Sequence, residues 1–220
     1  MLFETGFTWE REGTDQAFVR TFTWPQVELH GGVTSWLDLA VIWDGLVSAS
    51  TRVSDPDRRL EDTSTGFDDF RLGVKVRLVA RPRFQSALIA YVNVPVGSAA
   101  FSRRYAEPFT RVAWSLPLTE RFGVSGTVDL KAVKEDDDRA RAKPAGSAAL
   151  NASLTDTLDG FVGIVSEPPD FGSRPKAWSV EAGLVRAIGE KHQIDVSMSR
   201  RIIGDLDDWF ISAGFIRRLR

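Results

Sequence analysis

The chain of 220 residues contains no cysteine and only two histidines, His30 and His192. Without cysteine there is no disulfide, no thiolate metal site and no cysteine nucleophile. Each histidine stands next to an expected tight turn, and no H-x-x-x-H spacing or histidine–serine cluster indicates a zinc site or a catalytic triad. We therefore expect structural roles for both, and no catalytic residue, metal or cofactor.

Long apolar runs are also missing. No segment approaches the roughly 18 apolar residues of a transmembrane helix, and the mean hydropathy is −0.15. This is typical of soluble proteins, but the strands of a transmembrane β-barrel are apolar on one face only and give the same result. Met1 is followed directly by the alternating segment LFETGFTWERE. With no signal peptide in the chain, we expect either a cytosolic protein or one whose export signal was removed.

A strong net charge is absent too, since the formal value is −2. Each basic cluster lies near acidic residues, so nothing favours nucleic acid as a partner. The arginine pairs at 58–59, 103–104 and 200–201 could bind anionic lipid headgroups or solutes, although the first two fit solvated loops better. The acidic segment 135–139 has the carboxylates of a calcium loop without its ligand spacing or glycine. We expect it to be an external loop.

What the sequence does have is alternation. In FRLGVKVRLV (70–79) apolar residues occupy every second position, and Arg71, Lys75 and Arg77 lie between them. A period of two is that of a β-strand with one apolar and one charged face. In a soluble protein the apolar face would enter the core. In a membrane barrel it would face lipid, and the charges would line the lumen.

Alternating segments recur along the whole chain, while helix signals are nearly absent. Many of the segments exceed the ~5–6 residues of globular strands and match the ~9–11 residues of a tilted membrane-spanning strand. We expect about twelve strands: 2–11, 17–32, 36–48, 67–79, 84–95, 107–117, 122–133, 145–154, 158–166, 176–187, 192–202 and 208–219.

The connections between these segments alternate between short turns and longer polar loops. The short ones are 33–35, 80–83, 119–121, 155–157 and 189–191, and the long ones are 12–16, 49–66, 96–106, 134–144, 167–175 and 204–207. Strict alternation places all short turns at one end, as in outer-membrane barrels with short periplasmic turns and longer external loops. The fold class expected is therefore all-β, a single antiparallel transmembrane barrel over residues 1–220, with both termini at the periplasmic end. Tryptophans near strand ends would suit the aromatic girdles of such a barrel.

Three segments carry a family resemblance: VELHGGVTSWLDLAVIWDGL (27–46), FDDFRLGVKVRL (67–78) and the C-terminal HQIDVSMSRRIIGDLDDWFISAGFIRRL. They resemble the outer-membrane barrel family associated with a meta-cleavage pathway of phenol degradation. The matching residues are Gly32, Thr34, Asp38, Leu39, Asp69, Gly73, Lys75, Leu78, Gln193, Asp195, Asp207, Asp208, Trp209, Phe210, Gly214 and Phe215. The resemblance implies a channel for small organic compounds, with no catalytic residues to carry over.

Function is expected on the inward-facing polar rows, where charges of both signs mix with small residues. The residues expected to line the solute path are Asp38, Asp44, Arg71, Lys75, Arg77, Ile89, Tyr91, Arg111, Asp129, Lys131, Glu181 and Asp195. Mixed signs argue against a strongly ion-selective pore. The prediction is a porin-like, passive outer-membrane channel for small, largely uncharged organic molecules, aromatic ones included. Its other partners would be lipopolysaccharide and phospholipid.

Two other functions remain open at this point. In a soluble up-and-down barrel, the apolar rows would line a dry ligand cavity. In a membrane-embedded lipid hydrolase, His30 or His192 would meet a serine through the tertiary fold. Behaviour in detergent-free buffer separates the first from the channel, and esterase turnover identifies the second.

Strand parity also predicts which inward charges face each other. A three-residue turn at 119–121 places Arg111 opposite Asp129. Between the segments 36–48 and 67–79, one register opposes Asp38 to Arg77 and Asp44 to Arg71. A shift of that register opposes Asp44 to Asp69, and like charges directly opposed are unfavourable. We therefore expect the first register.

Overall fold

The structure, a computed structural model, describes residues 1–14, 16–55, 58–134, 140–167, 177–203 and 208–219. These residues form β-strands joined by turns and loops, and no helix among them is long and apolar enough to cross a membrane. The acidic segment 135–139 lies outside the described residues. The strands are β1 (Leu2–Gly13), β2 (Ala17–Gly32), β3 (Leu37–Trp43), β4 (Leu46–Asp55), β5 (Arg58–Phe67), β6 (Phe70–Arg81), β7 (Phe84–Val94), β8 (Pro108–Pro117), β9 (Phe122–Lys134), β10 (Ala140–Thr155), β11 (Leu158–Glu167), β12 (Ala177–Ile188), β13 (His192–Ile203) and β14 (Trp209–Arg218).

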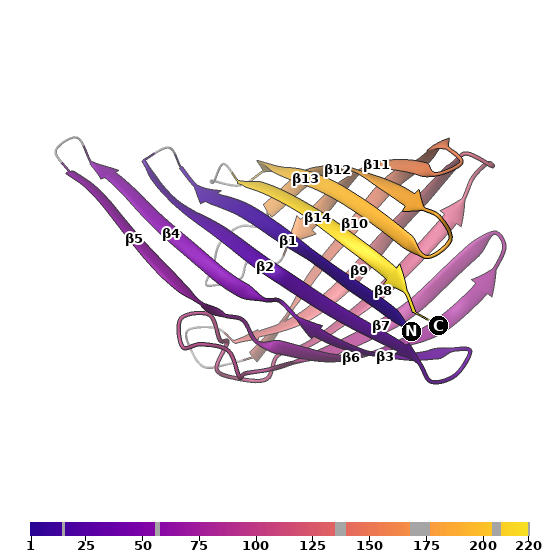
Figure 1. Ribbon diagram of the computed structural model, residues 1–220, viewed down its shortest axis with the longest axis horizontal. Coiled ribbons are helices and arrows are strands. Elements are labelled where there is room, and N and C mark those ends of the chain that lie inside the picture. Colours follow the sequence, from indigo (N-terminus) through magenta and orange to yellow (C-terminus); the bar gives the residue numbers. More distant parts are fainter. Residues whose placement is uncertain (15, 56–57, 135–139, 168–176, 204–207, 220) are drawn as a thin grey trace.

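Twelve of these strands close into an antiparallel barrel (Figure 1). The ring runs β1, β2, β3 and then β6 to β14, and β1 closes it by pairing with both β2 and β14. The termini lie together at one end, where the Leu219 N–H donates to the Met1 carbonyl at 2.8 Å. The predicted barrel of about twelve strands is confirmed.

The prediction of an external loop at 49–66 is wrong, because the described part of this segment is a β-hairpin. The long strand β2 pairs with β3 through residues 27–32 and with β4 through residues 17–24. The chain therefore continues from β3 into β4 with a break at Asp44 and Gly45, and from β5 into β6 with a break at 68–69. Gly45 has φ 95°, which favours glycine, and a Cβ there would overlap the Pro25 carbonyl.

The β4–β5 hairpin extends beyond the ring at the end opposite the termini (Figure 1). Beyond the Leu46–Phe67 pair at its base, its outward face is polar, with Ser48, Ser50 and Arg52 on β4 opposite Thr65, Thr63 and Glu61 on β5. The outward rows on β6 are instead apolar, and Leu72 and Val74 lie 47% and 38% exposed. The hairpin thus projects past the apolar band. Because several of its outward residues are serine or threonine, the sequence of the hairpin lacks the alternation of apolar and polar residues that indicates a strand.

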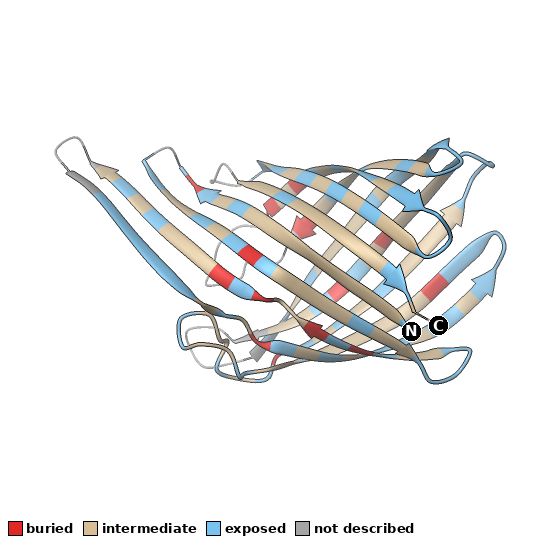
Figure 2. Cartoon of the chain, viewed as in Figure 1, coloured by how far each residue is buried: buried red, intermediate tan, exposed pale blue. Residues whose placement is uncertain are grey.

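The apolar side chains of the barrel face outward rather than into a core. Buried residues are few and scattered (Figure 2), and the buried apolar residues among those described are Ala40, Ile42, Val47 and Ala177. Outward rows expose large side chains such as Val128 (63%) on β9, and the same holds around the ring. A water-soluble protein rarely exposes so much contiguous apolar surface. The soluble barrel with an apolar cavity does not match this arrangement, because those leucines and valines point the other way.

One predicted register is confirmed and the other is wrong. Arg111 lies opposite Asp129 between β8 and β9, as the turn at 119–121 predicted. Between β3 and β6, however, Asp38 lies opposite Lys75 and Ile42 opposite Arg71, so Arg77 is not the partner of Asp38. The expectation assumed that this register would bring Asp44 against Asp69, but β3 ends before Asp44.

Asp69 is a buried residue with hydrogen-bond partners of its own. Its carboxylate is 1% exposed and accepts hydrogen bonds from Asn93 Nδ2 and the Gly97 N–H, both at 2.7 Å, and from the Arg103 N–H at 2.9 Å. Burial alone would raise the pKa of Asp69, but these hydrogen bonds outweigh it and hold the pKa below its usual value. Asp69 therefore ties the segment 95–107 to the start of β6.

Single cysteines would test the orientation of the barrel, because these 220 residues contain none. Thr63 lies on the projecting hairpin and Glu120 on a short turn at the end of the termini, and both are exposed. A membrane-impermeant maleimide applied to intact cells should label T63C and spare E120C. Permeabilising the outer membrane should make E120C reactive. Labelling of E120C in intact cells would contradict this orientation.

Candidate solute path

The predicted path residues project from the inner face of the barrel wall. Directly opposed residues of neighbouring strands lie on the same face of the sheet. Lys75 is opposite Ile89, which is opposite Arg111, which in turn is opposite Asp129. All four therefore face inward. The alternate positions carry the exposed apolar rows. The same parity places Asp38, Tyr91, Lys131, Glu181 and Asp195 inside.

The strongest inward ion pair is bidentate. Arg111 donates from Nε to Asp129 Oδ1 at 2.9 Å and from Nη2 to Asp129 Oδ2 at 2.7 Å. Asp129 is buried, while 40% of the Arg111 side chain is exposed. The fork geometry fixes both groups, and the positive charge is neutralised at the wall instead of projecting alone into the lumen.

A second inward pair joins Arg71 and Asp44. It crosses the break after β3, since Ile42 and not Asp44 is directly opposite Arg71. The predicted partners are therefore correct, although the register that predicted them is not. Because of this break, Asp44 pairs with Arg71 and is not opposed to Asp69.

An aromatic surface lies between these two pairs. Tyr91 and Phe109 stack at 6.2 Å between ring centroids with 22° between their planes, and the guanidinium carbons of Arg71 and Arg111 lie 5.9 Å from Tyr91 and 5.2 Å from Phe109. Gly73 is opposite Tyr91, and a Cβ at this glycine would overlap the ring. The tyrosine can thus lie close to the wall over Gly73. The sequence interpretation missed Phe109, although it shares the parity of Arg111.

Acidic residues gather on another part of the wall, on β1, β2 and β13. Glu4 lies opposite Glu28, and Glu28 contacts His30 Nε2. A cavity of about 220 Å³ is lined by Glu4, Glu28 and Asp195 together with Asp44 and Arg71. Sequence reasoning included Asp195 and missed both glutamates. The parity of Glu4 in the segment 2–11 could have indicated it, whereas the parity changes within the segment 17–32 before Glu28.

A larger cavity of about 710 Å³ lies nearer the termini. It brings together Asp38, Lys75, Arg77 and Ile89 from the predicted set, and its lining also includes Trp36 at a short turn. Neither of these two cavities is lined by the other five predicted residues, Tyr91, Arg111, Asp129, Lys131 and Glu181. A cavity of about 150 Å³ is enough to hold benzene, so side chains leave room in the lumen for a small organic molecule.

The two histidines have no catalytic setting in the described part of the chain. His30 contacts Glu28, and His192 stacks on Phe215 at 5.7 Å on the outward side. Neither has a serine as a hydrogen-bond partner among the described contacts. The described residues also contain no cluster of three or more side chains that could hold a metal ion.

Comparisons with known proteins add the family and the fold. A family model with the description "Putative MetA-pathway of phenol degradation" matches residues 5–219, and a comparison with curated proteins gives no match. The KdgM porin, solved with disordered oligogalacturonate, has a TM-score of 0.59 at 6% identity, covering 99% of each chain. The Pseudomonas putida toluene transporter TodX has a TM-score of 0.53 at 8% identity, covering 98% of this chain and 87% of TodX.

A third similar structure is the CymD monoaromatic hydrocarbon channel, with a TM-score of 0.50 at 9% identity and coverage of 99% of this chain and 88% of CymD. At such low identities these likenesses show the fold alone. They agree with the closed antiparallel barrel described above.

The Arg111–Asp129 pair should contribute measurably to stability. Breaking a buried ion pair costs ~3–5 kcal/mol, but Arg111 is partly exposed and screened, so we expect R111Q to lower the free energy of unfolding by roughly 1–3 kcal/mol. R77Q, at an exposed inward arginine, should change it by less than about 0.5 kcal/mol. Urea unfolding in lipid vesicles measures both.

The double variant R111Q/D129N removes both charges and should recover part of the loss. If R111Q and R77Q unfold at the same urea concentration, the Arg111–Asp129 pair does not contribute to the stability of the barrel.

Proposed function

Because the chain belongs to the family described by its link to phenol degradation, we propose that it is an outer-membrane channel for the passive passage of small, largely uncharged organic molecules. The observation that carries the proposal is the Tyr91–Phe109 surface on the inner wall, whose neighbours Arg71 and Ile89 line unfilled lumen space. Residues 1–220 would act as one barrel domain, surrounded by lipopolysaccharide and phospholipid. The proposed function involves no chemical step.

The electrostatics of the path favour an uncharged solute. The arginines next to the aromatic surface are each paired with an aspartate, Arg71 with Asp44 and Arg111 with Asp129. Anion-selective pores instead present rings of arginine or lysine to the solute. Glu4, Glu28 and Asp195 near the smaller cavity would oppose an anion further.

The aromatic surface favours a flat, polarisable solute. An aromatic molecule passing Tyr91 and Phe109 could stack on their faces, and such contacts are worth ~0.5–1.5 kcal/mol beyond the burial of area. That is enough to bias entry without trapping the solute. Two structurally similar barrels, the CymD monoaromatic hydrocarbon channel and the toluene transporter TodX, suggest the same solute class.

Flux through liposomes would test this selectivity, with solutes that cross bare bilayers slowly. We would compare the swelling rates given by phenyl glucoside and cyclohexyl glucoside, which are uncharged and similar in size. The wild type should admit the phenyl compound about 2- to 10-fold faster, as expected for one stacking contact. The double variant Y91A/F109A should lose this preference while keeping a wider path.

The matched control is F161A, which removes an inward phenylalanine of β11, opposite Gly183. It should keep the preference for the phenyl compound. Equal rates for both solutes in the wild type would count against aromatic selectivity. Rates no higher than those of bare liposomes for every solute would show a plugged barrel.

A further inference from the structure

Three arginines from three strands surround one phenylalanine on the outward face of the barrel. The guanidinium carbons of Arg11 on β1, Arg20 on β2 and Arg52 on β4 lie 4.7, 4.8 and 5.8 Å from the ring centroid of Phe18. A guanidinium at this distance from an aromatic ring is held by cation–π attraction. We call these four residues the arginine–phenylalanine cluster.

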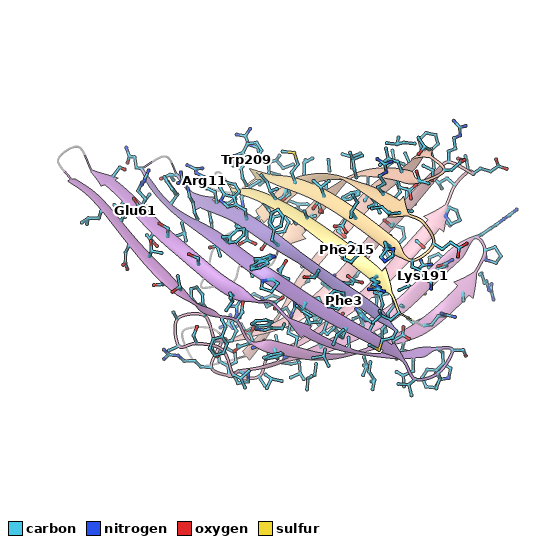
Figure 3. All side chains as sticks on the ribbon, viewed as in Figure 1. Phe3, Arg11, Glu61, Lys191, Trp209 and Phe215 are labelled. Carbon is cyan, nitrogen blue, oxygen red and sulfur yellow. The ribbon has the colours of Figure 1, made fainter. Side chains whose placement is uncertain are left out.

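The cluster lies just beyond the apolar band, at the end away from the termini. Figure 3 shows Arg11 and Trp209 at that end, and Phe3 and Lys191 near the termini. The next outward residues of β2 toward the band are Phe22 and Trp24, which are 44% and 56% exposed. In an outer membrane this depth is where headgroups meet acyl chains on the external side.

Two arginines of the cluster are directly opposed. Arg11 lies opposite Arg20 in the β1–β2 register, and like charges in this position repel each other. Arg52 forms an ion pair with Glu61 at 2.9 Å. An anion between Arg11 and Arg20 would reduce their repulsion.

A second arginine–aromatic pair extends the cluster along the barrel. Arg200 on β13 lies 4.8 Å from the Trp209 ring on β14, and Trp209 is directly opposite Arg11. Four arginines from neighbouring strands therefore share one outward region. A ligand carrying two separated phosphates could contact both parts of it.

We propose that the arginine–phenylalanine cluster binds the phosphate groups of lipopolysaccharide. Guanidinium groups bind phosphate through two parallel hydrogen bonds, and the phosphates of this lipid lie at headgroup depth in the external leaflet. Its acyl chains would run along Phe22 and Trp24 toward the centre of the membrane. The inference rests on the outer-membrane location and orientation proposed above, and it does not depend on passage of a solute.

Lipid binding to the purified barrel in detergent would test the proposal. Native mass spectrometry would compare phosphorylated lipid A, dephosphorylated lipid A and phosphatidylglycerol as added ligands. Phosphorylated lipid A should bind the wild type most tightly. R11Q/R20Q should weaken its binding by roughly tenfold or more, because two charges near the headgroups are removed. R11K/R20K keeps the charges without the planar fork and should restore part of the affinity.

The matched control is R186Q/R217Q, which removes two outward arginines near the short turns, opposite Leu158 and Phe3. It should bind phosphorylated lipid A as the wild type does. Equal binding of the dephosphorylated lipid, or unchanged affinity in R11Q/R20Q, would overturn the proposal. So would competition by millimolar inorganic phosphate, because the site would then bind free phosphate.

Swelling of liposomes that lack lipopolysaccharide separates this inference from the channel. R11Q/R20Q should admit phenyl glucoside at the wild-type rate, since the cluster lies outside the lumen. A barrel that binds the lipid without conducting would refute only the channel, and one that conducts without binding the lipid would refute only the cluster.

Discussion

Closure of the sheet is the constraint on which the rest of the structure depends. Backbone N–H and C=O groups have no water to bond in the hydrocarbon layer, so a β-sheet can span it only as a closed ring. β1 supplies that closure by pairing with β14 on one side and β2 on the other. Of the described strands, β5 pairs on one side only, with β4, and it lies in the polar hairpin beyond the apolar band.

Closure also divides the side chains into two environments. Alternate residues face outward as the apolar rows that lipid covers, and the others must share a confined lumen. Inside, charged groups satisfy one another at the wall, as Arg111 does with Asp129 and Arg71 with Asp44. This pairing leaves the aromatic surface of Tyr91 and Phe109 on the inner wall, and the neighbouring residues Arg71 and Ile89 line open cavities. The same alternation places arginines outside, at the edge of the apolar band, where lipid phosphates lie.

Parity made much of this arrangement predictable from the sequence. The number of strands in the ring, the inward position of Arg71 and the pairing of Arg111 with Asp129 all follow from a period of two and a tight turn. The β4–β5 hairpin was not predictable, because its outward residues are polar and resemble a loop. The β3–β6 register failed because the partners of Asp69, which include Asn93 and Gly97, come from segments that only the fold brings near. An irregularity opposite Gly6 and Thr8 changes the inward parity within β2, which obscured Glu28.

Conductance in a planar bilayer tests most directly the central claim that the closed barrel encloses an open path. The account predicts discrete current steps for the wild type, with weak ion selectivity, and larger steps for D44A/R71A. This variant removes both partners of one inward pair and widens the path without leaving an unpaired charge. A folded, membrane-inserted barrel that gives no current in either form would contradict the account.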